Sequence, residues 1–285
     1  FNIKELKNNN SHKIAFSYFH GDPRLNNKNN VLFKKIINNI NKISKIHVSN
    51  SIMQSILLDE GVDDCKIHKI PISININNFN SLTKEKKYDL KRQLQIPLDK
   101  KIIGSFQKDG IGWKNGNLPK YEKGPDIFIK SLVELNKKNK NIHVLLTGPS
   151  RGYVINELKK NNISFTYLKF VNYHLMQNYY NLIDLYIVTS REEGGPRSIL
   201  ESMATRTPII STKVGQAIDL IVNNINGFIV DIDDYLSIAQ ISEKIFENYY
   251  DLDNIINNGR ITAEKNAYES QINLWKSFFN GFYHN

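Results

Sequence analysis

The sequence predicts a doubly wound α/β fold in two parts, and three observations carry this prediction. Short β-branched runs are continuous rather than alternating, which is typical of parallel strands buried on both faces. Longer amphipathic stretches separate these runs along most of the chain. The length of 285 residues is enough for about two domains at roughly 150 residues each.

Nine apolar runs are expected to be strands, and each is followed by a helical pattern. The expected strands are residues 14–19, 46–49, 67–74, 101–106, 143–147, 165–170, 185–189, 209–211 and 228–230. The helical patterns lie near residues 29–43, 51–60, 84–94, 125–138, 152–161, 174–182, 197–205, 215–223 and 235–249. The segment 261–283 is expected to be one helix with an aromatic tail. This alternation favours parallel sheets covered by helices on both faces.

The segment 71–83 is the best candidate for a linker, because it carries several Asn residues and no apolar periodicity. We expect four segments: the end of a first domain, a linker, a second domain and a C-terminal helix, at residues 1–74, 75–83, 84–265 and 266–285. About 70 residues with two or three strands are few for an α/β domain, which typically has about 100 or more. We therefore expect the first domain to lack its initial βα units and the linker to act as a hinge.

Composition excludes several classes of protein. The single cysteine, Cys65, rules out an internal disulfide framework and a Cys-rich zinc site, and it suits a reducing compartment. No apolar run reaches the roughly 18 to 20 residues that cross a bilayer. The opening FNIKELKNNN has neither an initiator Met nor a signal-peptide pattern, so we expect a lost N-terminus and a cytoplasmic protein.

The positive charge is concentrated in the first half of the chain. The sequence has 38 Lys and Arg against 28 Asp and Glu, a formal charge of +10. Residues 1–150 hold 26 basic and 13 acidic side chains, and residues 151–285 hold 12 and 15. The first half could face an anionic acceptor or membrane surface, such as the inner membrane face, or its lysines could simply be solvated. No basic stripe with interleaved aromatics is present, so we expect no nucleic-acid partner.

A glycine-rich loop, REEGGPRS, follows the expected strand 185–189. Gly194 and Gly195 free the backbone to approach a ligand, and Pro196 suits the first position of a helix. A diphosphate could then bind the amides that open the helix, those of Arg197, Ser198 and Ile199.

Two acids flank this loop with the spacing E-x7-E. Glu201 lies about five residues into the expected helix, roughly 7 Å along its axis, which suits a carboxylate that accepts hydrogen bonds from a ribose diol. Glu193 would be repelled by phosphate and would more readily bind a neutral sugar. The alternative is an ordinary βα turn with Glu201 solvated on a helix face.

A second loop, KDGIGWKNGNLPKYE, lies between the expected strand 101–106 and the helix that starts after Lys123 and Gly124. It is longer than the usual connection of about 2–6 residues. Loops at the carboxyl ends of parallel strands are where α/β proteins bind ligands.

These segments together resemble the retaining glycosyltransferases of family 4. The family's C-terminal signature is resembled by REEGGPRSILESMATRTPIISTKVG, Asp219 and the turn Asn226-Gly227. Its donor-phosphate strand and the Lys-Gly that follows are resembled by IIGSFQ and KYEKGPDIFIKSLVEL. The end of its first domain and its linker are resembled by VSNSIMQSILLDEGVDDCKIHKIPISININNF. The resemblance covers about positions 13 to 280. It implies the GT-B architecture of two Rossmann-like domains, here with the first truncated at its N-terminus. It also implies that the C-terminal helix, residues 266–285, crosses back to the first domain, whereas its pattern alone equally suits a C-terminal core helix.

The resemblance also implies site residues. Glu201 resembles the acid that holds the donor ribose, Glu193 the acid that holds the transferred sugar, and Lys123 the lysine that neutralises the leaving diphosphate. His20 resembles a first-domain histidine that faces the reacting centre. Taken alone, Lys123 could be a solvated charge and His20 a structural histidine. The donor-binding set implied by the resemblance also includes backbone and apolar positions, namely Gly104, Ser105, Val171, Gly194, Gly195, Arg197, Ser198 and Ile199.

One departure concerns the phosphate site. Relatives usually have an arginine directly after the glycine of the first strand, where this chain has Gly104-Ser105-Phe106-Gln107-Lys108. The second cation would then be Lys108, Arg151 or Arg191, or else the diphosphate is stabilised less strongly.

The resemblance implies transfer of a hexose from a nucleotide diphosphate sugar to a hydroxyl of a glycan, glycolipid or other acceptor, with retained anomeric configuration. No metal ligand cluster or nucleophilic triad is found in the sequence, so we expect no metal and no cofactor beyond the donor. Two alternatives stay open: a truncated remnant that binds nucleotide sugar without turnover, and a GT-B sugar-phosphate synthase or phosphorylase. The expected process is cell-surface glycan, polysaccharide or glycolipid synthesis.

Overall fold

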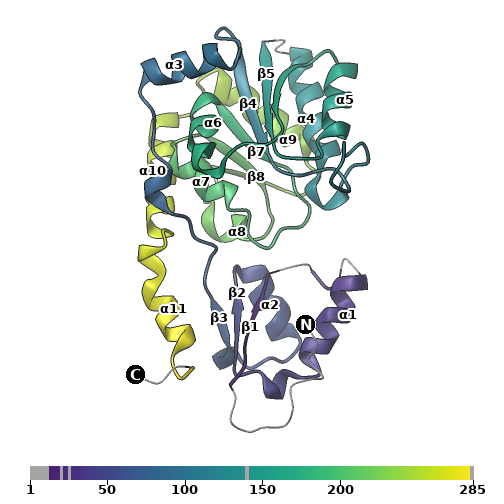
Figure 1. Ribbon diagram of the computed structural model, residues 1–285, viewed down its shortest axis with the longest axis vertical. Helices are drawn as coiled ribbons and strands as arrows, with labels where there is room; N and C mark the ends of the chain where they lie inside the picture. Colours follow the sequence, from purple (N-terminus) through teal and green to yellow (C-terminus); the bar gives the residue numbers. More distant parts are fainter. Residues whose placement is uncertain (1–12, 20–21, 25–26, 139–140, 283–285) are drawn as a thin grey trace.

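The structure is a computed structural model that describes residues 13–19, 22–24, 27–138 and 141–282. Two parallel sheets form two parts of the molecule, the larger above and the smaller below in Figure 1. Both consist of parallel strands flanked by helices, which confirms the α/β prediction. No helix among the described residues is long and apolar enough to span a membrane.

The smaller part has a three-stranded sheet in the order β1-β2-β3. Its elements are β1 (Ala15–Tyr18), α1 (Asn27–Ile37), β2 (Lys45–Val48), α2 (Ser51–Asp59) and β3 (Ile67–Lys69). Its own hydrophobic core includes Ile36, Ile46 and Leu57, which are almost completely buried. Strand β3 is shorter than the expected 67–74, because Pro71 has no amide to donate to a ladder and the chain crosses from there to the larger part.

The larger part has a six-stranded sheet in the order β6-β5-β4-β7-β8-β9. Its strands are β4 (Lys101–Phe106), β5 (Ile142–Thr147), β6 (Ser164–Leu168), β7 (Leu185–Val188), β8 (Ile209–Thr212) and β9 (Phe228–Val230). Its helices are α3 (Lys84–Gln93), α4 (Pro125–Lys138), α5 (Gly152–Lys160), α6 (Met176–Leu182), α7 (Ser198–Ala204), α8 (Ala217–Leu220), α9 (Tyr235–Phe246) and α10 (Leu252–Lys265).

Helices cover both faces of this sheet. One hydrophobic cluster joins the strands to α4, α5 and α9, and a second joins them to α6, α7 and α10. The continuous apolar strands therefore have a core on each side, as their sequences predict. The strand order runs outward in opposite directions from β4 and β7, so the loops that follow these two neighbouring strands meet at the switch point where such sheets bind ligands.

The C-terminal segment differs from the single helix expected over 261–283. Helix α10 ends at Lys265, and α11 (Ile272–Phe279) begins after a short interruption. The helix is interrupted there because Ala267 pairs with Ile74 of the connecting segment, and the amide of Tyr268 donates to the Ile74 carbonyl (3.0 Å).

Helix α11 lies beside the smaller sheet (Figure 1). The rings of Trp275 and Phe278 pack against His47 of β2, with centroid distances of 4.7 and 5.9 Å. Lys45 donates to the Ser277 carbonyl (2.7 Å). The two parts are thus connected twice, through the segment after β3 and through the chain that leads to α11.

Candidate functional site

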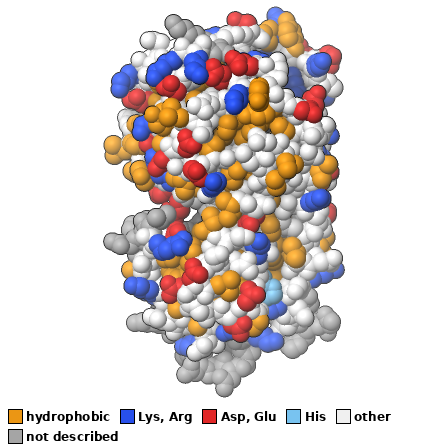
Figure 2. Space-filling model, turned by 180° about the vertical axis from the view of Figure 1, so that it is seen from behind, with side chains coloured by type: hydrophobic (Ala, Val, Ile, Leu, Met, Phe, Trp, Pro, Cys, Tyr) orange, Lys and Arg blue, Asp and Glu red, His pale blue; other side chains and the backbone are white. Residues whose placement is uncertain are grey.

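A cavity of about 490 Å³ lies between the two parts of the molecule. Phe19 and Ile72 line it from the smaller part and the connecting segment. From the larger part it is lined by residues of the loops after β4 and β7, namely Lys120, Glu122, Lys123, Glu192, Glu193, Gly194 and Gly195. Figure 2 shows the molecule narrowed where the two parts meet. Four of the predicted site residues, from two distant loops, therefore line one cavity: Lys123, Glu193, Gly194 and Gly195.

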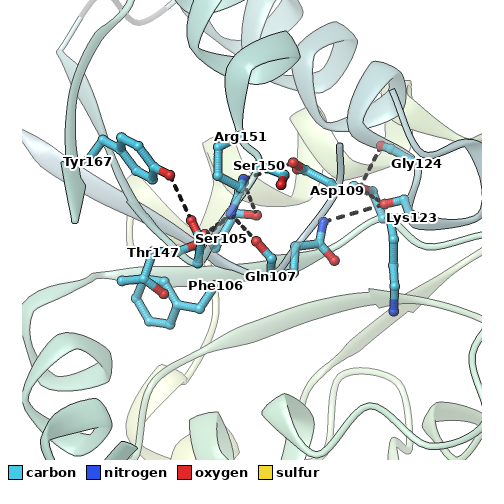
Figure 3. A network of polar contacts seen from close by, with 12 residues as sticks. Ser105, Phe106, Gln107, Asp109, Lys123, Gly124, Thr147, Ser150, Arg151 and Tyr167 are labelled. Atoms are coloured by element: carbon cyan, nitrogen blue, oxygen red, sulfur yellow. Dashed lines mark hydrogen bonds and ion pairs between the residues drawn. The ribbon is translucent and has the colours of Figure 1, made fainter. Parts of the chain in front are cut away.

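Lys123 reaches this cavity because of the tight turn that follows it. It ends a short 3₁₀ helix, Tyr121–Lys123, and the next residue, Gly124, adopts a left-handed conformation with φ of 58°. A Cβ at Gly124 would overlap the carbonyl of Thr189, so only glycine allows the turn to approach the end of β7 this closely. Figure 3 shows the Lys123 side chain pointing away from the polar network behind the turn.

The ammonium of Lys123 forms an ion pair with Glu193, with Nζ 2.5 Å from Oε1. Ser190 donates to the same carboxylate oxygen (2.8 Å). Both charged side chains are largely shielded from solvent, so the pair compensates charges that would be costly to bury alone. From the sequence, Lys123 and Glu193 are expected to contact different parts of a ligand, whereas in the structure they form an ion pair with each other.

Glu201 lies on α7 and is only 6% exposed. The hydroxyls of Tyr173 and Tyr180 donate to its two carboxylate oxygens, each at 2.9 Å. Burial raises the pKa of Glu201, while these hydroxyls and the nearby Arg197 oppose the shift. The interpretation of Glu201 as a solvated side chain is therefore wrong.

The two tyrosines were not identified from the sequence. Tyr180 is fully buried on α6, and Tyr173 is half-exposed just before it. Burial, together with the charge of Glu201, raises the pKa of Tyr173 to about 12, so its hydroxyl keeps the proton that it donates. The dense aromatic content of YHLMQNYY was the only available signal, and it equally suits an ordinary core helix.

The glycine pair of the β7 loop lines the cavity and also makes a contact that the sequence did not predict. A Cβ at Gly194 would overlap the carbonyl of Phe19, and a Cβ at Gly195 would clash with Ile72. The Gly194 carbonyl accepts hydrogen bonds from Ser49 (2.6 Å) and from the side chain of Asn50. The close backbone approach made possible by these glycines is thus to the smaller part of the molecule.

The helix start also differs in detail. Helix α7 begins at Ser198, two residues after Pro196, so Pro196 is not its first residue. The amide of Ile199 donates to the Pro196 carbonyl (3.1 Å), which corrects the expectation that this amide faces an anion. Arg197 takes the N-cap position and its side chain is exposed.

Gly104 and Ser105 lie inside the buried strand β4. A Cβ at Gly104 would clash with Ile183, and the hydroxyl and carbonyl of Ser105 accept hydrogen bonds from Arg151 (3.0 and 2.7 Å). Val171 packs at the edge of the hydrophobic cluster beneath α6 and α7. The structure gives all three residues packing contacts.

Two of the three candidates for the second cation of the phosphate site already form ion pairs within the protein. Arg151 is completely buried (Figure 3). Its Nε lies 2.9 Å from Oδ1 of Asp109, and it also donates to the Thr147 carbonyl (2.9 Å). Arg191 donates to both carboxylate oxygens of Asp126, each at 2.8 Å, and its Nε lies 2.6 Å from Oδ1 of Asp233.

The other cations near the site are more accessible. Lys108 stacks on Trp113, with Nζ 3.6 Å from the ring centroid. Lys120, which sequence reasoning did not select, lines the cavity. His20 falls outside the described residues, although its neighbour Phe19 lines the cavity. Within the described part of the chain, no three His, Cys, Asp or Glu residues gather in a metal-binding arrangement.

The fold and this cavity define an α/β protein of the GT-B type, with two parallel-sheet units around a cleft. Residues 95–262 match the family described as glycosyl transferases group 1. The chain therefore belongs to the glycosyl transferases group 1 family.

The chain is similar to several glycosyltransferases. It is 31% identical to the capsular polysaccharide biosynthesis glycosyltransferase CapM of Staphylococcus aureus over 211 residues, which is 64% of this chain and 55% of CapM. It is 25% identical to the lipopolysaccharide core biosynthesis mannosyltransferase LpsB of Rhizobium meliloti, over 63% of this chain and 51% of LpsB. The chain thus spans about half the length of these relatives.

Solved structures share the fold. The Anabaena protein HepE, solved in complex with UDP-glucose, has a TM-score of 0.76 at 17% identity, with coverage of 93% of this chain and 70% of HepE. TarM has a TM-score of 0.73 at 19% identity, over 96% of this chain and 51% of TarM. These similarities confirm the GT-B fold expected from the resemblance.

Proposed function

We propose that this protein is a hexosyltransferase that moves a sugar from a nucleotide diphosphate donor to an acceptor hydroxyl with retention of configuration. The observation that carries the proposal is the arrangement at the switch point: Glu193 and Lys123 line one interdomain cavity, and Glu201 lies on the helix that follows the same loop. Nearby relatives named for capsule and lipopolysaccharide synthesis support a role in making cell-surface glycans.

In the proposed reaction, the bond from the anomeric carbon to the diphosphate oxygen breaks, and a bond from that carbon to the acceptor oxygen forms on the same face. The acceptor proton passes to the departing phosphate. Lys123 would neutralise the charge that develops on the leaving oxygen, because its flexible ammonium can exchange Glu193 for phosphate. Glu193, once released, would hold the transferred sugar.

Glu201 would bind the donor ribose from its buried position. Each carboxylate oxygen has two lone pairs, so it can accept from a tyrosine hydroxyl and still accept from a ribose hydroxyl. His20 lies outside the described residues, and its proposed role at the reacting centre rests on the resemblance alone. The reaction proposed here uses no metal and no cofactor beyond the donor.

A screen of nucleotide sugars by thermal unfolding tests donor binding. A donor present at about 100 times its dissociation constant should stabilise the protein by about 2.7 kcal/mol. UDP-glucose is the first choice, because the similar HepE was solved with it. If no nucleotide sugar raises the unfolding temperature, the proposal is wrong.

Turnover assays then separate the enzyme from its two alternatives. With the binding donor, a hydroxyl acceptor should be glycosylated, whereas free phosphate and sugar phosphates should not be. Product with a sugar phosphate would instead indicate a synthase, and product with free phosphate a phosphorylase. Binding without any turnover would indicate a nucleotide-sugar-binding protein.

A further inference from the structure

The loop after β4 forms a short finger, residues 107–120, that is defined by its own backbone pairing. Gly110 and Pro119 form an antiparallel bridge, and the Ile111 amide donates to the Leu118 carbonyl (2.9 Å). Below this pair, the Lys120 amide donates to the Asp109 carbonyl (2.7 Å). The two sides of the β4 finger are thus held together along its length.

The β4 finger is also fastened to the start of α5. Ser150 donates to the Gly112 carbonyl (2.9 Å), and the first amides of α5, from Gly152 and Tyr153, donate to carbonyls of the finger (2.7 and 2.9 Å). The buried ion pair between Arg151 and Asp109 fixes the base (Figure 3). The large apolar side chains of the finger take no part in these contacts.

Those large side chains are apolar and exposed. Within the finger, Trp113 is 78% exposed, Leu118 is 67% exposed and Ile111 is similarly open to solvent. Tyr121, the residue directly after the finger, is also exposed, with the Arg191 guanidinium over its ring. Exposure of one such side chain is ordinary, but four within eleven residues on an ordered loop form a patch of the kind that marks an interaction surface.

The patch is surrounded by positive charge. Lys108, Lys114 and Lys120 belong to the finger, and Lys169 lines a recess together with Lys114. The sole acid of the finger, Asp109, is buried against Arg151, so it does not offset these lysines at the surface. Among the described residues, none of these four lysines forms an ion pair, so the surface combines apolar side chains with cations.

We propose that the β4 finger docks on an anionic phospholipid bilayer. Trp and Tyr rings favour the interface, aliphatic tips such as Leu118 favour the acyl region, and lysines attract anionic headgroups. The side chains of Ile111 and Leu118 favour this occupant over a glycan, because aliphatic tips offer a polyhydroxylated chain no hydrogen bonds.

Docking there would also orient the cavity. Lys120 belongs to the β4 finger and also lines the interdomain cavity, so a docked finger would bring that cavity beside the bilayer. A lipid-linked acceptor could then enter from the membrane. This last consequence rests on the proposed transferase function, whereas docking itself does not.

Co-sedimentation with vesicles tests the proposal. The protein should bind vesicles of phosphatidylcholine mixed with phosphatidylglycerol and should not bind phosphatidylcholine alone. The double variant Trp113→Ala/Leu118→Ala should reduce the partition coefficient by about tenfold or more. Lys114→Ala should reduce it by about fivefold.

Tyr249→Ala is the matched control. Tyr249 is 71% exposed and lies near Lys244, with Nζ 5.1 Å from its ring centroid, but it follows the C-terminal end of α9. Helices of a doubly wound fold end at the amino edge of the sheet, opposite the β4 finger. Binding that falls equally in Tyr249→Ala, or that persists in the double variant, would overturn the proposal.

Tryptophan fluorescence gives an independent measurement. The chain has two tryptophans, and Trp275→Phe leaves Trp113 as the reporter. Its emission should shift to the blue with the mixed vesicles. An unchanged spectrum, or the same shift on addition of a soluble acidic glycan without lipid, would contradict membrane docking. Failure here leaves transfer to a soluble acceptor unaffected, so it is distinguishable from failure of the proposed function.

Discussion

The loops that follow β4 and β7 meet at the same cavity but are held in different ways. The β4 loop is fastened within the larger part, through Arg151–Asp109 and the start of α5. The β7 loop is held by both parts. Within the larger part, Arg191 binds Asp126 (2.8 Å). From the smaller part, Ser49 and Asn50 donate to the Gly194 carbonyl, and the amide of Asp22 donates to Glu192 (2.9 Å).

The two loops therefore depend differently on the smaller part. The β4 loop keeps its shape whatever the smaller part does, because none of its anchors crosses between the parts. The contacts of Glu192 and Gly194 with the smaller part must break if the parts separate. We therefore expect the larger part alone to hold Lys123 beside Glu193, and the Gly194 carbonyl to be fixed only when the two parts are together.

Breaking the anchor of the β4 loop should have the largest effect on stability. Arg151→Met leaves Asp109 buried without its counter-charge, which should lower the free energy of unfolding by about 3–5 kcal/mol. Urea unfolding measures this difference.

Lys213→Met serves as the control for that experiment. Lys213 and Asp231 also form an ion pair (2.6 Å), but both side chains are at least half-exposed. Its removal should cost less than about 1 kcal/mol. Equal losses in the two variants would show that burial does not distinguish the β4 anchor.

Substitutions in the site should have the next largest effect. Lys123→Ala removes the cation proposed to meet the diphosphate, and Glu201→Ala removes the carboxylate proposed to hold the ribose. Each should reduce donor binding or turnover more than tenfold, or about 1.4 kcal/mol. Titration calorimetry with the donor from the thermal screen measures the change in donor affinity.

Stability must be measured on the same variants. Glu201 is buried, so a loss of binding is informative only where the variant stays folded under assay conditions. Activity at the unsubstituted level in both variants would refute the assignment of the site, whatever their stability.

The sequence predicted most of the fold because its signals are local. Continuous apolar strands and their helices follow from burial on both faces, and β4, α4 and β9 have their expected bounds. The sequence also predicted that the loops after β4 and β7 bind a ligand. The structure places both loops at one cavity, and the ligand contacts themselves stay a prediction.

What the sequence could not show were partners distant along the chain. The ion pair of Lys123 with Glu193 spans 70 residues, and the hydrogen bond from Tyr173 to Glu201 comes from a segment with no polar motif. Arg151 was a candidate for the phosphate site, and only its burial against Asp109 shows that it is structural. The interruption before α11 depends on pairing with Ile74, which no local pattern encodes.

The smallest expected effect tests whether the β7 loop depends on the smaller part. Ser49→Ala removes one donor to the Gly194 carbonyl, which keeps Asn50, so the loss should be near the low end of about 0.5–1.5 kcal/mol. Ser242→Ala removes an equally buried hydroxyl that donates to Ile238 within α9 (2.7 Å). Hydrogen exchange over residues 191–197 should accelerate in Ser49→Ala and stay unchanged in Ser242→Ala, because only the first bond crosses between the parts. If neither variant alters exchange in this segment, the contacts within the larger part are enough to hold the β7 loop, and the contrast with the β4 loop fails.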